Sequence, residues 1–150
     1  MDRNELRAAR LRVKDRLKGY QDTKKEIKRL DDEIIELEAE MIYPSSPNLD
    51  GMPHGGAGGD AFLRYMDRKD SLTRDYYSAK ERLLNELDTI ERAIQYMPEK
   101  QKTVVWLRYV GGLRWEDICE EIHYSWRQVH YLHAAAIDRL IPVFGSEREE

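Results

Sequence analysis

Apolar side chains recur every seven residues through the first forty positions, and this repeat constrains the fold more than any other feature. The side chains at the repeated position are Leu6, Val13, Tyr20, Ile27, Ile34 and Met41. Leu30 and Leu37 add a second apolar position, so that the repeat forms a continuous stripe along one long helix. We therefore expect a coiled-coil helix over residues 2–41, in which the six repeated side chains form an oligomerisation seam.

The charge of this helix changes sign along its length. Residues 1–29 contain eleven Lys and Arg against five Asp and Glu, whereas residues 30–41 contain six acids and no base. An antiparallel second copy would place each basic half beside an acidic half, which favours a homodimer. The alternative is that the seam pairs within one chain, and both arrangements satisfy the repeat.

A Gly- and Pro-rich segment separates this helix from a second one. Residues 43–59 contain three prolines and five glycines, and such a composition does not continue a helix. Asp60 is expected to cap a second long helix that reaches Met97. The apolar repeat of this helix is Phe62, Tyr76, Leu83, Ile90 and Met97. Two seams joined by one loop predict an antiparallel coiled-coil hairpin over residues 1–97. No segment has the alternation of a strand, so we expect an all-α fold.

Two short helices joined by a tight turn are expected near the C-terminus. The apolar residues that would pack between them are Ile118, Ile122, Val129 and Leu132. Ser125 suits the N-cap of the second helix, because its hydroxyl can accept a hydrogen bond from a free backbone N–H. The outer face of that helix would carry Trp126, Arg127, His130 and Tyr131. A helix-turn-helix inserts such a helix into the major groove of double-stranded DNA.

The residues around these two helices resemble region 4 of bacterial sigma factors. The resemblance covers residues 97–141. It opens at Met97-Pro98-Glu99, passes through Leu107-Arg108-Tyr109 and a Gly-containing turn, and closes at Ala136-Ile137. It implies a compact three-helix helix-turn-helix domain over residues 98–141. Pro142 is then expected to end the last helix, ahead of an acidic tail over residues 142–150.

The resemblance also implies which side chains meet DNA. Arg127 would contact guanine, while Gln128 and Arg114 match positions that contact phosphates in the family. His133 would continue the exposed side of the helix. The full set of expected DNA-binding residues is Arg114, Ser125, Trp126, Arg127, Gln128, His130, Tyr131 and His133.

Two departures from the sigma pattern fall inside the helix-turn-helix. His123 stands where the family has a glycine, so that either a left-handed backbone there is strained or the turn differs. Trp126 and Tyr131 stand where family members more often have Arg, Lys, Gln or Glu. These changes imply an altered target sequence or a loss of DNA binding.

The remainder of the chain resembles small phage-encoded proteins, close to the late-gene transcription regulators of phages of Gram-positive bacteria. The segment from Ser46-Pro47 to Met52-Pro53 and the helix that begins at Asp60 carry this resemblance. It implies a transcription regulator in the bacterial host cytoplasm, with RNA polymerase as a candidate partner. Two other interpretations fit the same features. One is a small terminase-type DNA-packaging subunit, and the other is a module that binds polymerase or another host protein without DNA.

Composition limits the other classes of function. The net charge of the chain is −4, and residues 98–141 contain six Lys and Arg against six Asp and Glu, so this domain alone is expected to bind DNA weakly. Cys119 is the single cysteine, which excludes an internal disulfide. No apolar run approaches the ~18 residues of a membrane span, so we expect no membrane partner. His130 and His133 lack further metal ligands, and no catalytic or nucleotide-binding pattern occurs. We therefore expect no metal, no cofactor and no enzymatic activity.

Overall fold

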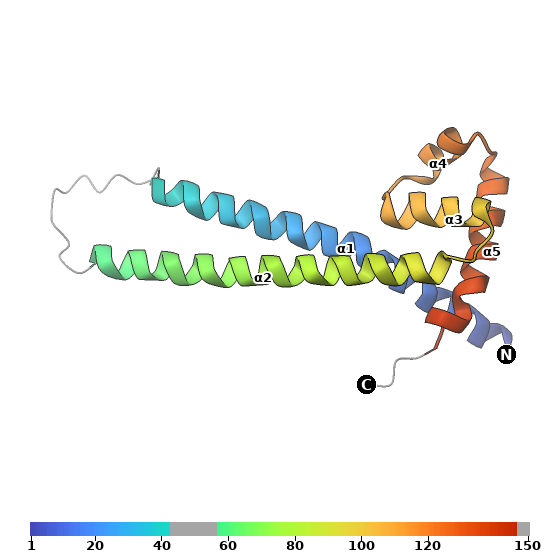
Figure 1. The fold of residues 1–150 in the computed structure, drawn as a ribbon, viewed down its shortest axis with the longest axis horizontal. Coiled ribbons are helices and arrows are strands. Elements are labelled where there is room, and N and C mark those ends of the chain that lie inside the picture. Colours follow the sequence, from blue (N-terminus) through green and yellow to red (C-terminus); the bar gives the residue numbers. More distant parts are fainter. Residues whose placement is uncertain (43–56, 147–150) are drawn as a thin grey trace. The chain divides into compact units, whose positions relative to one another are not determined.

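The structure, a computed structural model, describes residues 1–42 and 57–146, and its regular elements are all helical. The elements in chain order are α1 (Arg3–Ile42), α2 (Ala57–Ile94), α3 (Glu99–Val105), the π-helix η1 (Trp106–Val110), α4 (Trp115–Ile122) and α5 (Trp126–Phe144) (Figure 1). The expected all-α class is confirmed. Most of the expected loop over residues 43–59 lies outside the described residues.

The chain divides into two compact units, and both long helices contribute to each of them. One unit contains residues 1–22 and 83–150, and the other contains residues 23–82. This division differs from the expected boundary between residues 97 and 98. The start of α1 and the end of α2 belong to the same compact unit as the C-terminal helices, because they share its hydrophobic core.

Residues 23–82 form an antiparallel pair of helices with its own apolar seam. Leu30, Leu72 and Ala79 are buried, and the partly buried residues around them are Ile27, Ile34, Leu37 and Tyr76. Ion pairs join Glu26 to Arg82 at 3.1 Å and Glu38 to Lys69 at 3.3 Å, so that residue numbers rise along α1 as they fall along α2. The seam in this unit therefore pairs within one chain.

The core of the other unit corrects the expected oligomerisation seam. Val13 and Tyr20 of α1 are 0% and 8% exposed, because they pack against α2, η1 and α5 of the same chain. The other buried residues of this core are Leu17, Ile90, Ile94, Val105, Tyr109, Ala136, Ile137 and Leu140. Val13 and Tyr20 are thus unavailable to a second copy in this fold. Ile27 and Ile34 are likewise partly buried in the chain, Leu6 is half-buried, and Met41 is exposed.

The two short helices near the C-terminus pack as expected. Ile118 of α4 and Val129 of α5 are fully buried together with Val104 of α3, and Ile122 and Leu132 flank them. This second cluster fixes α5 against α4. The opposite side of the α5 N-terminus lies outside this cluster and is exposed to solvent.

Two helix ends differ from expectation. Helix α2 begins at Ala57, three residues before the predicted cap at Asp60. Helix α5 continues past Pro142 to Phe144, so the prediction that Pro142 ends it is wrong. A proline in the last turn removes only one helical hydrogen bond, and the Gly145 N–H then closes the helix on the Ile141 carbonyl at 2.8 Å. No helix within residues 1–42 and 57–146 is long and apolar enough to cross a membrane.

Candidate DNA-binding surface

The turn between α4 and α5 contains a left-handed residue that is not glycine. His123 has φ 56° and ψ 41°, and its backbone N–H closes α4 on the Cys119 carbonyl. Within the described part of the chain it is the only non-glycine residue with positive φ. The chain therefore keeps the left-handed turn and accepts a backbone cost of about 1–2 kcal/mol.

The N-terminus of α5 is held by a reciprocal cap. The Ser125 hydroxyl accepts a hydrogen bond from the Gln128 N–H at 3.2 Å, and the Gln128 side-chain oxygen accepts one from the Ser125 N–H at 2.9 Å. The expected N-cap at Ser125 is thus confirmed. Because the Gln128 oxygen is engaged, the donor that remains for a DNA phosphate is its side-chain amide NH2.

Three of the expected DNA-contacting side chains project from the start of α5. Trp126 is 52% exposed, Tyr131 is 75% exposed, and Arg127 is also exposed. Trp106 and Trp115 are half-buried, so Trp126 is the one exposed tryptophan. Their spacing over the first two turns places these residues on an accessible face that a DNA groove can approach.

His130 lies behind Trp126 rather than beside it on the open surface. Its ring centroid is 4.4 Å from that of Trp126 and 4.6 Å from that of Trp115. Its Nε2 atom is buried without a hydrogen-bond partner among the described residues. His130 therefore supports the Trp126 ring by packing between α4 and α5.

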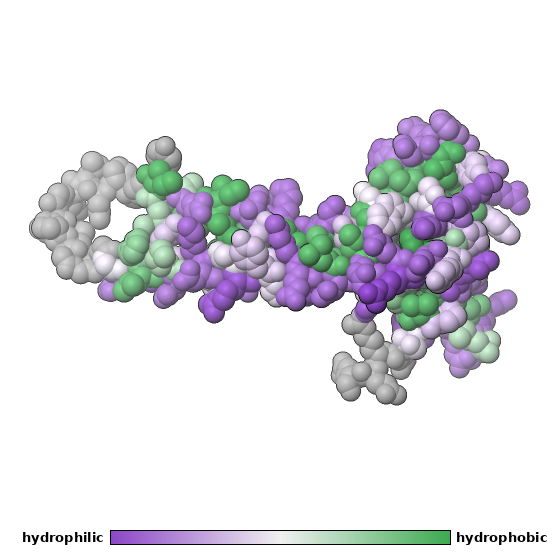
Figure 2. Space-filling model, viewed as in Figure 1, coloured by the Kyte–Doolittle hydropathy of each residue, from purple (hydrophilic) through white to green (hydrophobic). Residues whose placement is uncertain are grey.

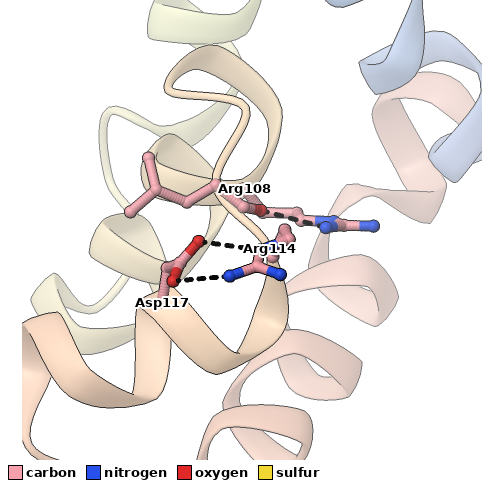
Figure 3. Close-up of polar contacts among 4 residues, drawn as sticks. Arg108, Arg114 and Asp117 are labelled. Atoms are coloured by element: carbon pink, nitrogen blue, oxygen red, sulfur yellow. Dashed lines mark hydrogen bonds and ion pairs between the residues drawn. The ribbon is translucent and has the colours of Figure 1, made fainter.

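Arg108 completes this row of stacked groups. Its guanidinium lies 4.6 Å from the Trp115 ring centroid. It also donates a hydrogen bond to the Leu113 carbonyl at 2.9 Å (Figure 3). A cation over an indole face is stabilising, and the indole is the preferred ring. A stack of four side chains thus runs from η1 to the exposed edge of α5, in the order Arg108, Trp115, His130 and Trp126. This stack fixes the position of Trp126.

Arg114 precedes α4 and is paired with a carboxylate. Its Nε atom is 3.1 Å from the Asp117 carboxylate (Figure 3). This hydrogen bond raises the pKa of Arg114 and lowers the pKa of Asp117. The Arg114 side chain is 75% exposed. Because exposed ion pairs are weak, a phosphate can compete with Asp117 for this guanidinium.

His133 is buried, and its expected position on the exposed side is wrong. It is 7% exposed, and its Nε2 atom is 2.7 Å from the Tyr109 hydroxyl. Burial lowers the pKa of His133 to about 4 and raises the pKa of Tyr109 to about 12, so both groups are neutral near pH 7. The cause is the helical period, since position 133 follows Val129 by one turn on the buried stripe.

Lys100 is a candidate DNA-binding residue that sequence reasoning did not single out. It lines an open groove of about 380 Å³ together with Tyr124, Arg127, Gln128, Tyr131 and Leu132. Its ammonium lies 5.4 Å from the Tyr124 ring centroid, and the hydrogen bond that it donates to the Tyr124 hydroxyl raises the pKa of Lys100. The pattern of α3 gave no sign of this role, because only the packing of α3 against α5 brings Lys100 beside the DNA-facing helix.

Comparison with known families identifies this part of the chain. Residues 87–140 match the model of the family described as sigma-70, region 4. This part of the chain is therefore similar to sigma-70 region 4, a family of helix-turn-helix DNA-binding domains. The match begins ten residues before the resemblance found by sequence reasoning, and it includes Ile90 and Ile94 of the shared core. No curated protein and no solved structure matches the chain.

Proposed function

We propose that this protein is a transcription regulator that recognises a DNA sequence by inserting the N-terminus of α5 into the major groove. The observation that carries the proposal is a region 4-like domain whose capped helix presents Trp126, Arg127 and Tyr131 to solvent. A helix-turn-helix contacts base edges with the N-terminal residues of its second helix.

Each exposed side chain has a role that its chemistry suits. The Arg127 guanidinium matches the two acceptors of guanine in the major groove, a contact worth about 1–3 kcal/mol of discrimination. Trp126 and Tyr131 offer apolar edges to thymine methyl groups. Lys100 and Arg114 supply charges for phosphates on either side, which position the helix without specifying sequence.

The charge of the domain indicates that it needs a partner to bind DNA tightly. Residues 98–141 contain six Lys and Arg and six Asp and Glu, so the domain has no excess of bases. Since phosphate contacts supply most of the nonspecific affinity, we propose that RNA polymerase or a second copy strengthens the complex. The resemblance of the remaining chain to small phage-encoded proteins supports a phage or prophage regulator.

Selection of bound sequences from a random duplex library at low salt tests the proposal. We expect an enriched motif with a guanine that Arg127→Ala no longer selects. Arg139→Ala is the matched control, because it removes the same charge from the same helix about three turns further on, and it should leave the motif unchanged. If folded protein enriches no motif, the regulator proposal fails, and a packaging subunit or a protein-binding module becomes the better account.

A further inference from the structure

The start of α1 carries basic side chains on one face of the helix. Arg3, Arg7, Arg10 and Lys14 are separated by four, three and four residues, a spacing that places them on the same side of α1. We call these four residues the basic row. Residues 3–18 contain seven Lys and Arg against two Asp and Glu, whereas residues 98–141 contain six of each. The start of α1 therefore has the excess of positive charge that the helix-turn-helix domain lacks.

The charges of the basic row are not neutralised along α1. The two acids of residues 3–18, Glu5 and Asp15, lie roughly 100° or more from the centre of the row. Arg3 and Arg7 are exposed and Lys14 is half-buried, and none of the three forms an ion pair within residues 1–42 and 57–146. Figure 2 shows hydrophilic surface over much of α5 and the start of α1. These three charges are thus available to an anionic partner.

Arg10 places the basic row beside the DNA-facing side of α5. Its Nε atom donates a hydrogen bond to the Asp138 carboxylate at 2.7 Å, and its Nη2 atom donates a second one at 3.1 Å. Arg127, Tyr131, Ala134 and Asp138 are all exposed and are separated by four, three and four residues, so they share one face of α5. The basic row therefore borders the face that carries Arg127 and Tyr131.

A second contact shows that the same face of α1 turns toward the helix-turn-helix further along. Gln21 lies on this face, seven residues after Lys14, and its side-chain amide donates a hydrogen bond to the Val110 carbonyl of η1 at 2.7 Å. Lys14 lies between the two contacts and near α5, since the pKa of His133 is lowered first by burial and then by the charge of Lys14. Residues 1–22 and 83–150 belong to one compact unit, so these contacts fix the basic row relative to α5.

The distance along α5 indicates which part of DNA the basic row would meet. Asp138 follows Arg127 by eleven residues, which is about 16 Å along the helix. The major groove is about 12 Å wide. When Arg127 lies at base edges, the basic row therefore lies beside the sugar–phosphate backbone that borders the groove.

We propose that Arg7 and Lys14, with Arg3 at the end of the row, bind phosphates of the DNA strand that borders the groove occupied by α5. This inference rests on the proposed function, because it takes the position of the DNA from α5. It extends the interface beyond residues 87–140, which match the family. Arg10 has a separate role, since it neutralises Asp138, a carboxylate that would otherwise repel the same phosphates.

The basic row changes the expected strength of binding but not its specificity. Phosphate contacts position a protein on DNA without reading sequence. Together with Lys100 and Arg114, the row gives about five phosphate contacts, fewer than the about 6–10 that make binding strongly salt-dependent. The full chain is thus expected to bind any duplex more tightly than residues 98–141 alone would.

Fluorescence anisotropy of the full chain at several salt concentrations tests the proposal, on the selected site and on a random duplex. Arg7→Ala and Lys14→Ala should each make the slope of log affinity against log salt shallower by about 0.9 on both duplexes. The selected motif should stay the same. Arg7→Lys should keep the original slope, because the lysine retains the charge.

Arg92→Ala is the matched control for these variants. Arg92 belongs to the same compact unit and is exposed on α2, about 160° from both Ile90 and Ile94 of the core. Its removal costs one positive charge away from the basic row, so the slope should not change. Circular dichroism should show equal helicity in all variants, and the exposed position of Arg7 makes its variant the decisive one.

Asp138→Asn tests the role of Arg10. Loss of the carboxylate releases the Arg10 guanidinium for a phosphate, so DNA should bind more tightly and with a slope steeper by about 0.9. Asp88→Asn is the control, because it breaks the exposed Arg92–Asp88 ion pair, at 3.1 Å, in the same unit. It should leave both affinity and slope unchanged. Weaker binding by Asp138→Asn would contradict a neutralising role for Arg10.

The outcomes separate this inference from the proposed function. A selected motif together with an unchanged slope for Arg7→Ala would overturn the basic row and leave the regulator proposal standing. Slopes that become shallower on a random duplex, without any selected motif, would support the basic row and overturn sequence-specific regulation. Absence of salt-dependent DNA binding would overturn both and favour an acidic protein partner for these charges.

Discussion

Trp126 combines high exposure with a fixed position, which makes it the most informative single side chain. It is 52% exposed, and its ring packs on His130. We expect Trp126→Ala to weaken binding to a selected DNA site by about tenfold or more. The melting temperature and helicity should change little, since surface substitutions usually alter stability by less than about 0.5 kcal/mol. Fluorescence anisotropy measures the loss of DNA binding, and thermal melting measures the stability. A variant that unfolds would mean that Trp126 belongs to the core.

His133 gives the fold a defined dependence on pH. Burial holds its pKa at about 4, below the ordinary value of 6.5, so the folded state binds fewer protons than the unfolded chain between these values. The stability that His133 contributes is therefore fully present above pH 6.5 and is lost as pH falls toward 4. We expect a loss of about 2 kcal/mol between pH 7 and pH 5.

Urea unfolding at both pH values measures this loss. His133→Gln should remove most of the difference, because glutamine does not titrate. His123→Asn is the control, since His123 is exposed and asparagine tolerates its left-handed backbone. An unchanged pH dependence in His133→Gln would assign the effect to other groups.

Sequence reasoning found the exposed residues of the site better than the buried ones. Trp126, Arg127 and Tyr131 lie where the pattern placed them, because a capped helix start fixes the first two turns. The prediction for His133 was wrong because it continued the exposed face of α5 by one turn too many. Position 133 belongs to the buried stripe of that helix. Lys100 was missed because its role depends on the approach of α3 to α5, which no local pattern encodes.

At the scale of elements, the turn between α4 and α5 stores backbone strain at His123. We expect His123→Gly to raise the free energy of unfolding by about 0.5–1 kcal/mol, because glycine adopts the left-handed conformation without a steric cost. Ala134→Gly is the matched control. It introduces glycine at an exposed position inside α5, where it should destabilise by about 1 kcal/mol. Urea unfolding compares the two, and destabilisation by His123→Gly would show that the His123 side chain contributes more than the strain costs.

The seven-residue repeat predicted both long helices but not what their seam contacts. Val13 and Tyr20 fit a seam between two chains as well as one within a chain, since the repeat records only which face is apolar. Their burial against α5 depends on the C-terminal helices folding back on α1. Pro142 shows the same limit, because a proline in the last turn costs too little to end a helix already held by Ile137 and Leu140.

At the scale of the whole molecule, the balance of charge governs how binding responds to salt. We expect a shallow dependence of DNA affinity on salt, since few Lys and Arg side chains are available to contact DNA phosphates. Lys100→Ala should reduce the slope of log affinity against log salt by about 0.9, the value for one lost phosphate contact. Lys25→Ala in the other unit is the control and should leave the slope unchanged. Anisotropy titrations at several salt concentrations give both slopes, and an unchanged slope for Lys100→Ala would remove Lys100 from the interface.

The most direct test of the account is interference by methylation of guanine N7, an atom that lies in the major groove. Duplexes carrying the selected site are methylated, bound and separated into bound and free fractions. We predict that methylation of one guanine per recognised site excludes DNA from the bound fraction, and that Arg127→Ala abolishes this exclusion while Arg139→Ala preserves it. Binding that tolerates methylation at every guanine would contradict recognition by Arg127 in the major groove.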